Sequence, residues 1–323
     1  MEKWYGAVQK ITESYLTRRK RKRELIRAKQ KAKNPIVDWI EAFLWAAIVV
    51  LIINQYAAQA YQIPSGSMKN TLQITDRIFV NKMIYGPELV PGAVKLPGFT
   101  SPERDEIIIF ESPTYISKGP LFDTFQRLIY MLTLSLVDID KDENGNPRPH
   151  FLIKRAVGME QDRIRFVRGE VEISPPGFET WIREAEFRRM AGLQDRTRRI
   201  IEQETYPSIK ASAWSDAYLS MNLNPPEELL AEGSRMPSVT DMFEWMKYRT
   251  EMLYRLNPQD RRAGGLWRKF DTGWYIGQGY ILPLGDNRDN SRDGRYFGPV
   301  SLKKVLGRAM FIYWPLGRMG AIH

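Results

Sequence analysis

One stretch of hydrophobic residues stands out near the beginning of the chain. Residues 42–53 are all apolar, and no charged residue lies between Ala42 and Met68. Aromatic residues flank the stretch where interfacial side chains would lie: Trp39, Trp45, Tyr56 and Tyr61. A bilayer requires ~20 apolar residues, and polar residues at 54, 55 and 59 dilute the second half, so a buried core helix is the alternative. The pattern favours a membrane-spanning anchor over residues 36–61.

Beyond this anchor, apolar residues occur in short runs. Runs rich in β-branched and aromatic residues lie at 78–82, 107–110, 151–157, 163–167 and 280–284, each bounded by Gly, Pro, Asp or Asn. Such runs are typical of strands. They predict a mainly β domain, a sheet or a barrel, to which residues 62–174 and 272–323 both contribute.

Two segments depart from the strand pattern. Residues 175–271 include stretches rich in Glu, Arg and Ala and predict a mostly helical insertion. Residues 112–149 form a second insertion, whose uncharged run at 128–137 is too short to span a bilayer; burial and a position in the membrane interface both fit it. The acidic positions 138, 140 and 142 begin like a calcium loop but lack its glycine, so we expect a solvated turn.

The positive charge of the chain is concentrated before the anchor. Residues 1–34 hold twelve basic side chains and three acidic ones, which accounts for nine of the ten net positive charges. By the positive-inside rule, residues 1–35 form a cytoplasmic tail and the chain beyond the anchor lies outside a cytoplasmic (inner) membrane, crossed once. No basic face remains for nucleic acid. The sequence Ala58-Gln59-Ala60 also resembles the end of a cleavable secretory signal, so cleavage there is an open alternative.

The residue types that are missing narrow the chemistry. The chain has no cysteine, which excludes disulfides and thiolate chemistry. A histidine-based catalytic triad would have to use His150, because the other histidine, His323, ends the chain. We expect no metal site and no organic cofactor.

A serine and a lysine are the strongest remaining candidates. Ser65-Gly66-Ser67 places two hydroxyls around a glycine just beyond the anchor, although this tripeptide alone is more typical of a linker. Lys154 lies within the 151–157 run, where alternation puts it on the same face as Leu152 and Ala156. Burial would disfavour its ammonium form and make it a base for a serine nucleophile. A solvated edge-strand lysine is the plainer interpretation.

The segment 285–299 is dense in turn-forming and oppositely charged residues. It predicts a hydrogen-bonded loop after the 280–284 strand. With Ile-Pro-Ser-Gly-Ser-Met beyond the anchor, Ile-Lys-Arg-Ala-Val-Gly on a strand and Gly-Asp-Asn-Arg-Asp-Asn-Ser near the end, the chain resembles the type I signal peptidases (leader peptidases) of bacterial secretion. The similar blocks, 63–85, 104–110, 151–173 and 276–312, occur in the family's order.

The resemblance implies a signal-peptidase-like β fold and a set of catalytic roles. Ser67 would be the acylating nucleophile and Lys154 the general base. The oxyanion would be held by the backbone N–H of Ser67 and the hydroxyl of Ser65, while Ser291 would orient the lysine amine. The remaining residues implied are Asp286, Asp293 and Arg295 as structural support, and Ile63, Leu72 and Ile153 as apolar pockets for small substrate residues.

The function expected from these roles is the removal of N-terminal signal peptides from exported precursors, after Ala-x-Ala. The expected partners are those precursors, the lipid bilayer and the secretion translocon. Two alternatives are a self-cleaving repressor of the Ser/Lys type and a non-catalytic, membrane-anchored assembly factor. Three departures from the family pattern affect turns: Asn70 replaces a proline, Arg104-Asp105-Glu106 replaces Arg-Gly-Asp, and Gln161 replaces a glycine.

Overall fold

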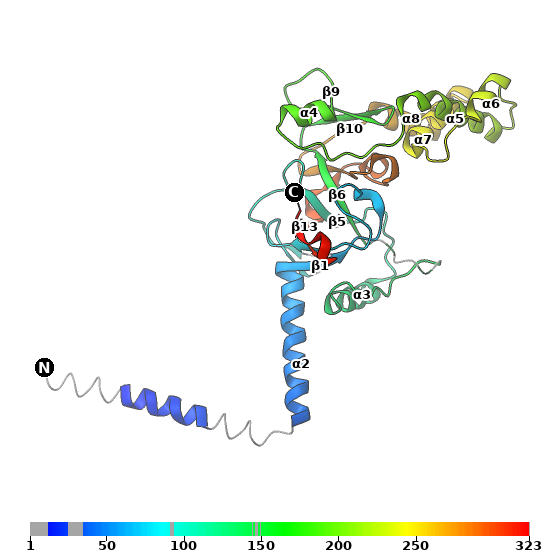
Figure 1. Ribbon diagram of the computed structural model, residues 1–323. Helices are drawn as coiled ribbons and strands as arrows, with labels where there is room; N and C mark the ends of the chain where they lie inside the picture. The colour runs from blue at the N-terminus through cyan, green and yellow to red at the C-terminus, as the bar shows by residue number, and fades with distance from the viewer. Residues whose placement is uncertain are drawn as a thin grey trace. The chain divides into compact units, whose positions relative to one another are not determined.

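A computed structural model describes residues 12–24, 35–90, 94–143, 145, 148 and 150–322 (Figure 1). The chain divides into two compact units, residues 1–51 and 52–323. Most of the basic tail expected over residues 1–35 lies outside the described residues, which include only the helical stretch 12–24 and Pro35 from it.

The expected apolar helix is present. Helix α2 (Pro35–Ile52) continues into a π-helical turn, η1 (Ile53–Ala57), and no side chain of α2 is buried. Together these 23 residues are long and apolar enough to cross a membrane. The prediction that the helix extends to residue 61 is wrong, because residues from Ala58 onward form strand β1 (Ala58–Gln62), which pairs with β2 (Arg77–Asn81).

The polar residues that diluted the apolar stretch explain why the helix ends early. Gln59 is 3% exposed, and its side chain accepts hydrogen bonds from the hydroxyl of Tyr61 and the amine of Lys82. These partners belong to the sheet, so β1 satisfies a buried amide that a membrane helix would leave unpaired. Ala60, the end of the signal-like tripeptide, is 1% exposed inside this strand.

An antiparallel sheet forms the centre of the second unit and confirms the mainly β prediction. Its order is β1-β2-β13-β5-β6-β11-β12, with β14 beside β13. The bounds of the strands not yet given are β5 (Ile107–Glu111), β6 (Phe151–Gly158), β11 (Tyr280–Leu284), β12 (Val300–Ser301), β13 (Val305–Trp314) and β14 (Gly320–Ala321). Because β11 pairs with β6, and β13 lies between β2 and β5, the two separated parts of the domain form one sheet.

The insertion over 175–271 is mostly helical, as predicted. Its helices are α4 (Glu184–Met190), α5 (Tyr206–Ser220), α6 (Glu227–Gly233), α7 (Met242–Leu256) and α8 (Arg261–Thr272). In the chain, these helices lie between β9 (Ile182–Arg183) and β10 (Trp274–Tyr275), two strands of a second sheet whose order is β10, β7 (Arg163–Val167), β8 (Glu170–Ser174) and β9. A two-stranded pair, β3 (Glu88–Val90) with β4 (Val94–Lys95), completes the strands. Figure 1 shows α5 to α8 grouped beyond β10, away from β1.

The insertion over 112–149 contains helix α3 (Pro120–Leu132). The solvated turn expected after it is wrong at its centre, because Asp140 is fully buried. Its carboxylate pairs with the amine of Lys118 at 2.6 Å and with the imidazole of His150 at 2.8 Å. Three groups able to pair with the carboxylate, including the hydroxyl of Tyr115, replace water around it.

Candidate active site

Ser67 lies on a single 3₁₀ turn, η2 (Gly66–Met68), shortly after β1. Met68 is 1% exposed and packs into the apolar core, which holds one side of the turn in place. From the other side, the backbone N–H of Asn287 donates to the carbonyl of Ser67 at 3.0 Å, and its side-chain amide donates to the carbonyl of Gly66 at 2.9 Å. The Ser67 turn is therefore held between the core and the 285–299 loop.

Lys154 lies on β6, between β5 and β11, and is 3% exposed. Its Nζ is 2.7 Å from Ser67 Oγ and donates a second hydrogen bond to the carbonyl of Ile153 at 2.9 Å. Burial lowers the pKa of Lys154 to about 8, while the carboxylates of Asp293 and Asp286 oppose the shift. An amine with this pKa is mostly protonated at pH 7, where about a tenth of it is uncharged, and it loses its proton readily above that pH.

Ser65 and Ser291 both lie near the pair but differ in their contacts. The hydroxyl of Ser65, which is exposed, is 3.5 Å from Ser67 Oγ. The hydrogen bond expected from Ser291 to the amine is absent: among the described residues, its buried Oγ has no hydrogen-bond partner. Ser291 Oγ instead lies against Gly285: a Cβ built at Gly285 would be 2.2 Å from this oxygen and 2.6 Å from the carbonyl oxygen of Ser67.

The residues expected to give structural support, Asp286, Asp293 and Arg295, take part in two separate ion pairs. Asp293 pairs with Arg295, and Asp286 pairs with Arg155. Arg295 Nε is 2.9 Å from Asp293 Oδ1, and Asp293 also accepts from the backbone N–H of Gly285 at 2.9 Å. The ion pair holds the pKa of Asp293 below its usual value although burial acts in the opposite direction. Asp286 instead accepts two hydrogen bonds from Arg155, each at 2.8 Å.

Arg155 is the main residue of the site that the sequence did not single out. It is fully buried and points to the opposite face of β6 from Lys154. The alternation that directs Lys154 toward Ser67 therefore directs its neighbour toward Asp286. The signal available in the sequence was the adjacency of two basic residues in an otherwise apolar strand.

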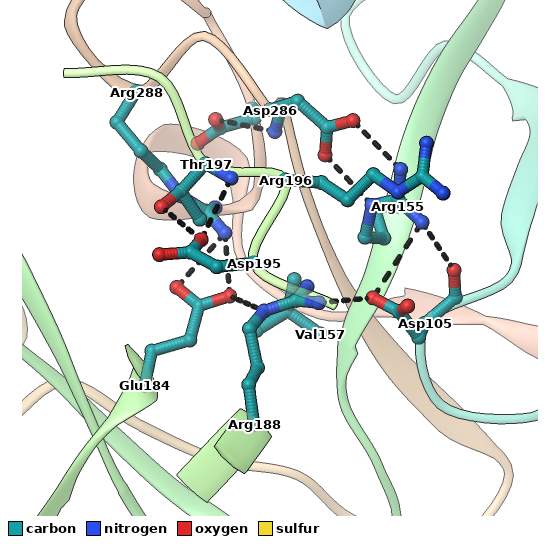
Figure 2. Close-up of polar contacts among 12 residues, drawn as sticks. Asp105, Arg155, Val157, Glu184, Arg188, Asp195, Arg196, Thr197, Asp286 and Arg288 are labelled. Carbon is teal, nitrogen blue, oxygen red and sulfur yellow. Dashed lines mark hydrogen bonds and ion pairs between the residues drawn. The ribbon is translucent and has the colours of Figure 1, made fainter. Parts of the chain in front are cut away.

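A chain of alternating charges extends from this ion pair into the helical insertion (Figure 2). Arg155 is 3.5 Å from Asp105, whose carboxylate is 2.5 Å from Arg188 on α4. Glu184 lies between Arg188, at 3.1 Å, and Arg288 of the 285–299 loop, at 2.7 Å. No sequence pattern connects α4 with this loop, because the two segments are about a hundred residues apart.

The segment after α4 also forms backbone hydrogen bonds with the 285–299 loop. The backbone of Arg198 donates to the carbonyl of Asp286 at 2.7 Å and accepts from the backbone N–H of Arg288 at 3.0 Å. Asp289 accepts from the backbone N–H of Ile200. Residues 196–201, which we call the insertion strap, therefore add a short strand-like edge to the loop that contacts Ser67.

The three residues expected to line a substrate pocket lie in one apolar cluster, which also contains Met68 of the turn that carries Ser67. Ile63, Leu72 and Ile153 are 3%, 0% and 9% exposed and share the cluster with Met68. Leu72 is fully covered, so in this conformation it supports the cluster without offering surface to a ligand. Within the described residues, no group of three His, Asp or Glu side chains is arranged to hold a metal ion.

A serine hydroxyl in contact with a buried, deprotonable amine can carry out nucleophilic acyl transfer. On an antiparallel β domain behind an apolar helix, this arrangement is that of a serine peptidase. The chain belongs to the signal peptidase family, peptidase S26, whose family model matches residues 36–314.

Named relatives agree with this assignment over most of the chain. Signal peptidase I of Haemophilus influenzae is 27% identical over 332 residues, covering 92% of this chain and 82% of the relative. Signal peptidase I of Pseudomonas aeruginosa is 24% identical, covering 90% of this chain and 81% of the relative. The enzyme of Aquifex aeolicus is 26% identical, with 85% and 82% covered. The helical insertion lies inside the matched region.

Proposed function

We propose that this protein is a membrane-anchored serine endopeptidase that removes N-terminal signal peptides from exported precursors by a Ser67/Lys154 dyad. The observation that carries the proposal is the 2.7 Å contact between Lys154 Nζ and Ser67 Oγ, with the lysine 3% exposed. Nucleophile and base must be within hydrogen-bond reach, and the base must be able to lose its charge.

Acylation begins when the uncharged amine of Lys154 accepts the hydroxyl proton of Ser67 as Oγ attacks the scissile carbonyl. The carbonyl becomes a tetrahedral oxyanion, to which the backbone N–H of Ser67 and the hydroxyl of Ser65 donate hydrogen bonds. The distance of 3.5 Å between the hydroxyls of Ser65 and Ser67 supports this role for Ser65. The oxyanion then collapses, the C–N bond breaks, and the Lys154 ammonium protonates the leaving amine.

Deacylation uses the same two groups. The uncharged amine of Lys154 accepts a proton from a water molecule, which attacks the acyl ester of Ser67. Collapse of the second tetrahedral oxyanion breaks the ester bond, and Lys154 returns the proton to Ser67 Oγ. Gly285 packs closely against Ser291 and the carbonyl oxygen of Ser67, while Asp293 and Arg295 hold the loop that carries Ser291.

The substrate preference proposed is for small residues, as in Ala-x-Ala, before the cleaved bond. The supporting feature is the apolar cluster that contains Met68, the residue after Ser67, together with Ile63, Leu72 and Ile153. A shallow apolar surface accepts methyl groups and rejects long or charged side chains. Small conformational changes at Leu72 would be needed for it to contact the substrate directly.

The proposed location is the cytoplasmic (inner) membrane, with the basic tail in the cytoplasm and the catalytic domain outside. Nine net positive charges before the apolar helix support this orientation. A precursor whose apolar segment remains in the bilayer presents its cleavage site close to the membrane surface. Tethering enzyme and substrate to that surface raises their effective concentration. The bilayer and the secretion translocon are the proposed partners.

The proposal is tested with purified full-length protein and a precursor that carries Ala-x-Ala before the expected cleavage site. Wild type should release a product that begins immediately after this motif, as measured by mass spectrometry. Ser67→Ala and Lys154→Ala should lose cleavage while keeping wild-type circular dichroism. If all three proteins are equally inactive, a non-catalytic assembly role replaces the proposal.

A further inference from the structure

Helix α3 (Pro120–Leu132) exposes its apolar residues. Leu121, Phe125, Leu128 and Leu132 are 88%, 58%, 41% and 44% exposed. Their spacing of four, three and four residues places them in one stripe along the helix. Within the part of the chain that the structure describes, nothing covers this stripe. Burial, one of the two interpretations of the run at 128–137, is therefore wrong for its two residues in the stripe, Leu128 and Leu132.

The opposite face of α3 is polar and is turned toward the domain. Arg127 lies between Glu111, at 3.0 Å, and Glu88, at 3.7 Å. Gln126 is 2% exposed and donates to Asp138 at 2.8 Å. A surface helix in water has the reverse arrangement, with its apolar stripe toward the core. The inverted polarity of α3 indicates that its outer face meets an apolar environment.

The stripe is held near the point where the apolar anchor helix ends. The side-chain amide of Gln55, in η1, donates to the carbonyl of Glu88 at 2.8 Å, and Glu88 is the residue whose carboxylate faces Arg127. The rings of Tyr61, in β1, and Tyr130, in α3, are 6.2 Å apart. In Figure 1, α3 lies at the β1 end of this unit, opposite the end that carries α4 to α8.

We propose that the α3 stripe lies in the lipid interface of the membrane that contains the anchor helix. Its apolar face and its nearness to η1 are the two observations that select lipid as the occupant. An interfacial helix buries its apolar side at the boundary of headgroups and acyl chains. Two contacts, the anchor and α3, would fix the tilt of the catalytic domain, which the anchor alone leaves free. The consequence for cleavage, a Ser67 held at constant height, rests on the proposed function.

The absence of cysteine makes a direct test possible. Leu121→Cys, Phe125→Cys and Leu128→Cys are each labelled with a bimane fluorophore in full-length protein reconstituted into phosphatidylcholine/phosphatidylglycerol vesicles. Leu219→Cys, at a leucine that is 56% exposed on α5, is the matched control. Spin-labelled lipids should quench the three α3 labels at least about threefold more than the control, and aqueous iodide should show the reverse order.

Two results would overturn the docking proposal. Labels on α3 that are quenched by iodide as strongly as the control would show that water covers the stripe. Labels shielded from both quenchers would show that a protein, including a second copy of this chain, covers it. The same labelling in a Ser67→Ala background should give unchanged lipid quenching, so the result is independent of whether the proposed dyad is correct.

Discussion

At the scale of single residues, the surroundings of Lys154 decide whether it can act as a base. An ammonium group at this position would lose most of its hydration, which is why burial lowers its pKa to about 8. Asp293 and Asp286 lie near enough to limit that fall. The result is an amine that is largely protonated at pH 7 and that still loses its proton easily.

The pH dependence of cleavage follows from this pKa. Because only the uncharged amine accepts the Ser67 proton, kcat/KM should rise about tenfold per pH unit below pH 8 and level off above it. A profile measured with the Ala-x-Ala precursor between pH 5 and 10 checks this. A rate independent of pH across the range 6–9 would exclude Lys154 as the base.

Folding stability should depend on the same lysine. The unfolded chain binds its proton up to about pH 10.5, whereas the folded protein releases it near pH 8, so wild-type stability rises with pH between these values. Lys154→Met removes the buried amine at similar length and should increase the free energy of unfolding by about 1–3 kcal/mol at pH 7. The gain should shrink by pH 10. Urea unfolding at both pH values measures it.

Backbone conformation explains the departures from the family pattern. Asp105 and Gln161, which replace glycines, have φ of +76° and +69°, and Asn70, which replaces a proline, has φ of +113°. The first two therefore keep a left-handed conformation that suits glycine, at some cost for other residues. At position 70, proline could not adopt the observed backbone conformation.

Two glycine substitutions should then have opposite effects. Gln161 is exposed, and Gln161→Gly should stabilise the fold by up to about 1 kcal/mol by relieving strain. Asp105→Gly relieves similar strain but removes the carboxylate that is 2.5 Å from the buried Arg188, and should destabilise by about 1–3 kcal/mol. Thermal unfolding compares them. Equal shifts would mean that the Asp105 ion pair adds nothing.

At the scale of elements, α4 and the insertion strap (residues 196–201) join the helical insertion to the 285–299 loop. Glu184 and Arg188 on α4 are 5% and 3% exposed. Glu184 forms an ion pair with Arg288, and Arg188 forms one with Asp105. Removing one member of a buried set leaves the others unpaired. The insertion therefore supports the loop whose Asn287 holds the Ser67 turn.

Arg188→Met tests this connection. It should lower the free energy of unfolding by about 3 kcal/mol and slow cleavage, because Asp105 and Glu184 lose a shared partner. Arg189→Met, at the exposed neighbouring position on α4, is the control and should change neither property. Unfolding and cleavage are measured on both variants. Wild-type values for Arg188→Met would separate α4 from the site.

Sequence patterns predicted the strands themselves better than the partners with which these elements pair and pack. The five predicted strands are present as β2, β5, β6, β7 and β11 because β-branched residues and turn formers mark them locally. Local patterns place the residues of β1 in the anchor and do not predict β13, because the pairing of both strands is set by residues distant in the chain. The orientation of α3 depends on charges at Glu88 and Glu111 that lie on other elements.

At the scale of the whole molecule, the site is assembled from segments far apart in the chain. Ser67 comes from the turn after β1, Lys154 from β6, and Ser291 from the loop after β11. Alternation along β6 allowed the burial of Lys154 to be predicted from sequence, but its 2.7 Å contact with Ser67 depends on the register of paired strands. The close approach of Ser291 to Gly285 likewise depends on the folded loop, so the local sequence does not mark it.

The most direct test of the account is to find where the acyl group forms. Full-length protein is mixed with the Ala-x-Ala precursor, quenched in acid within the first turnover, digested and analysed by mass spectrometry. The account predicts the signal-peptide acyl group on the peptide that contains Ser67 in wild type, and its loss in Lys154→Met. Acylation at another residue, or equal acylation of Ser67 in the lysine variant, would contradict it.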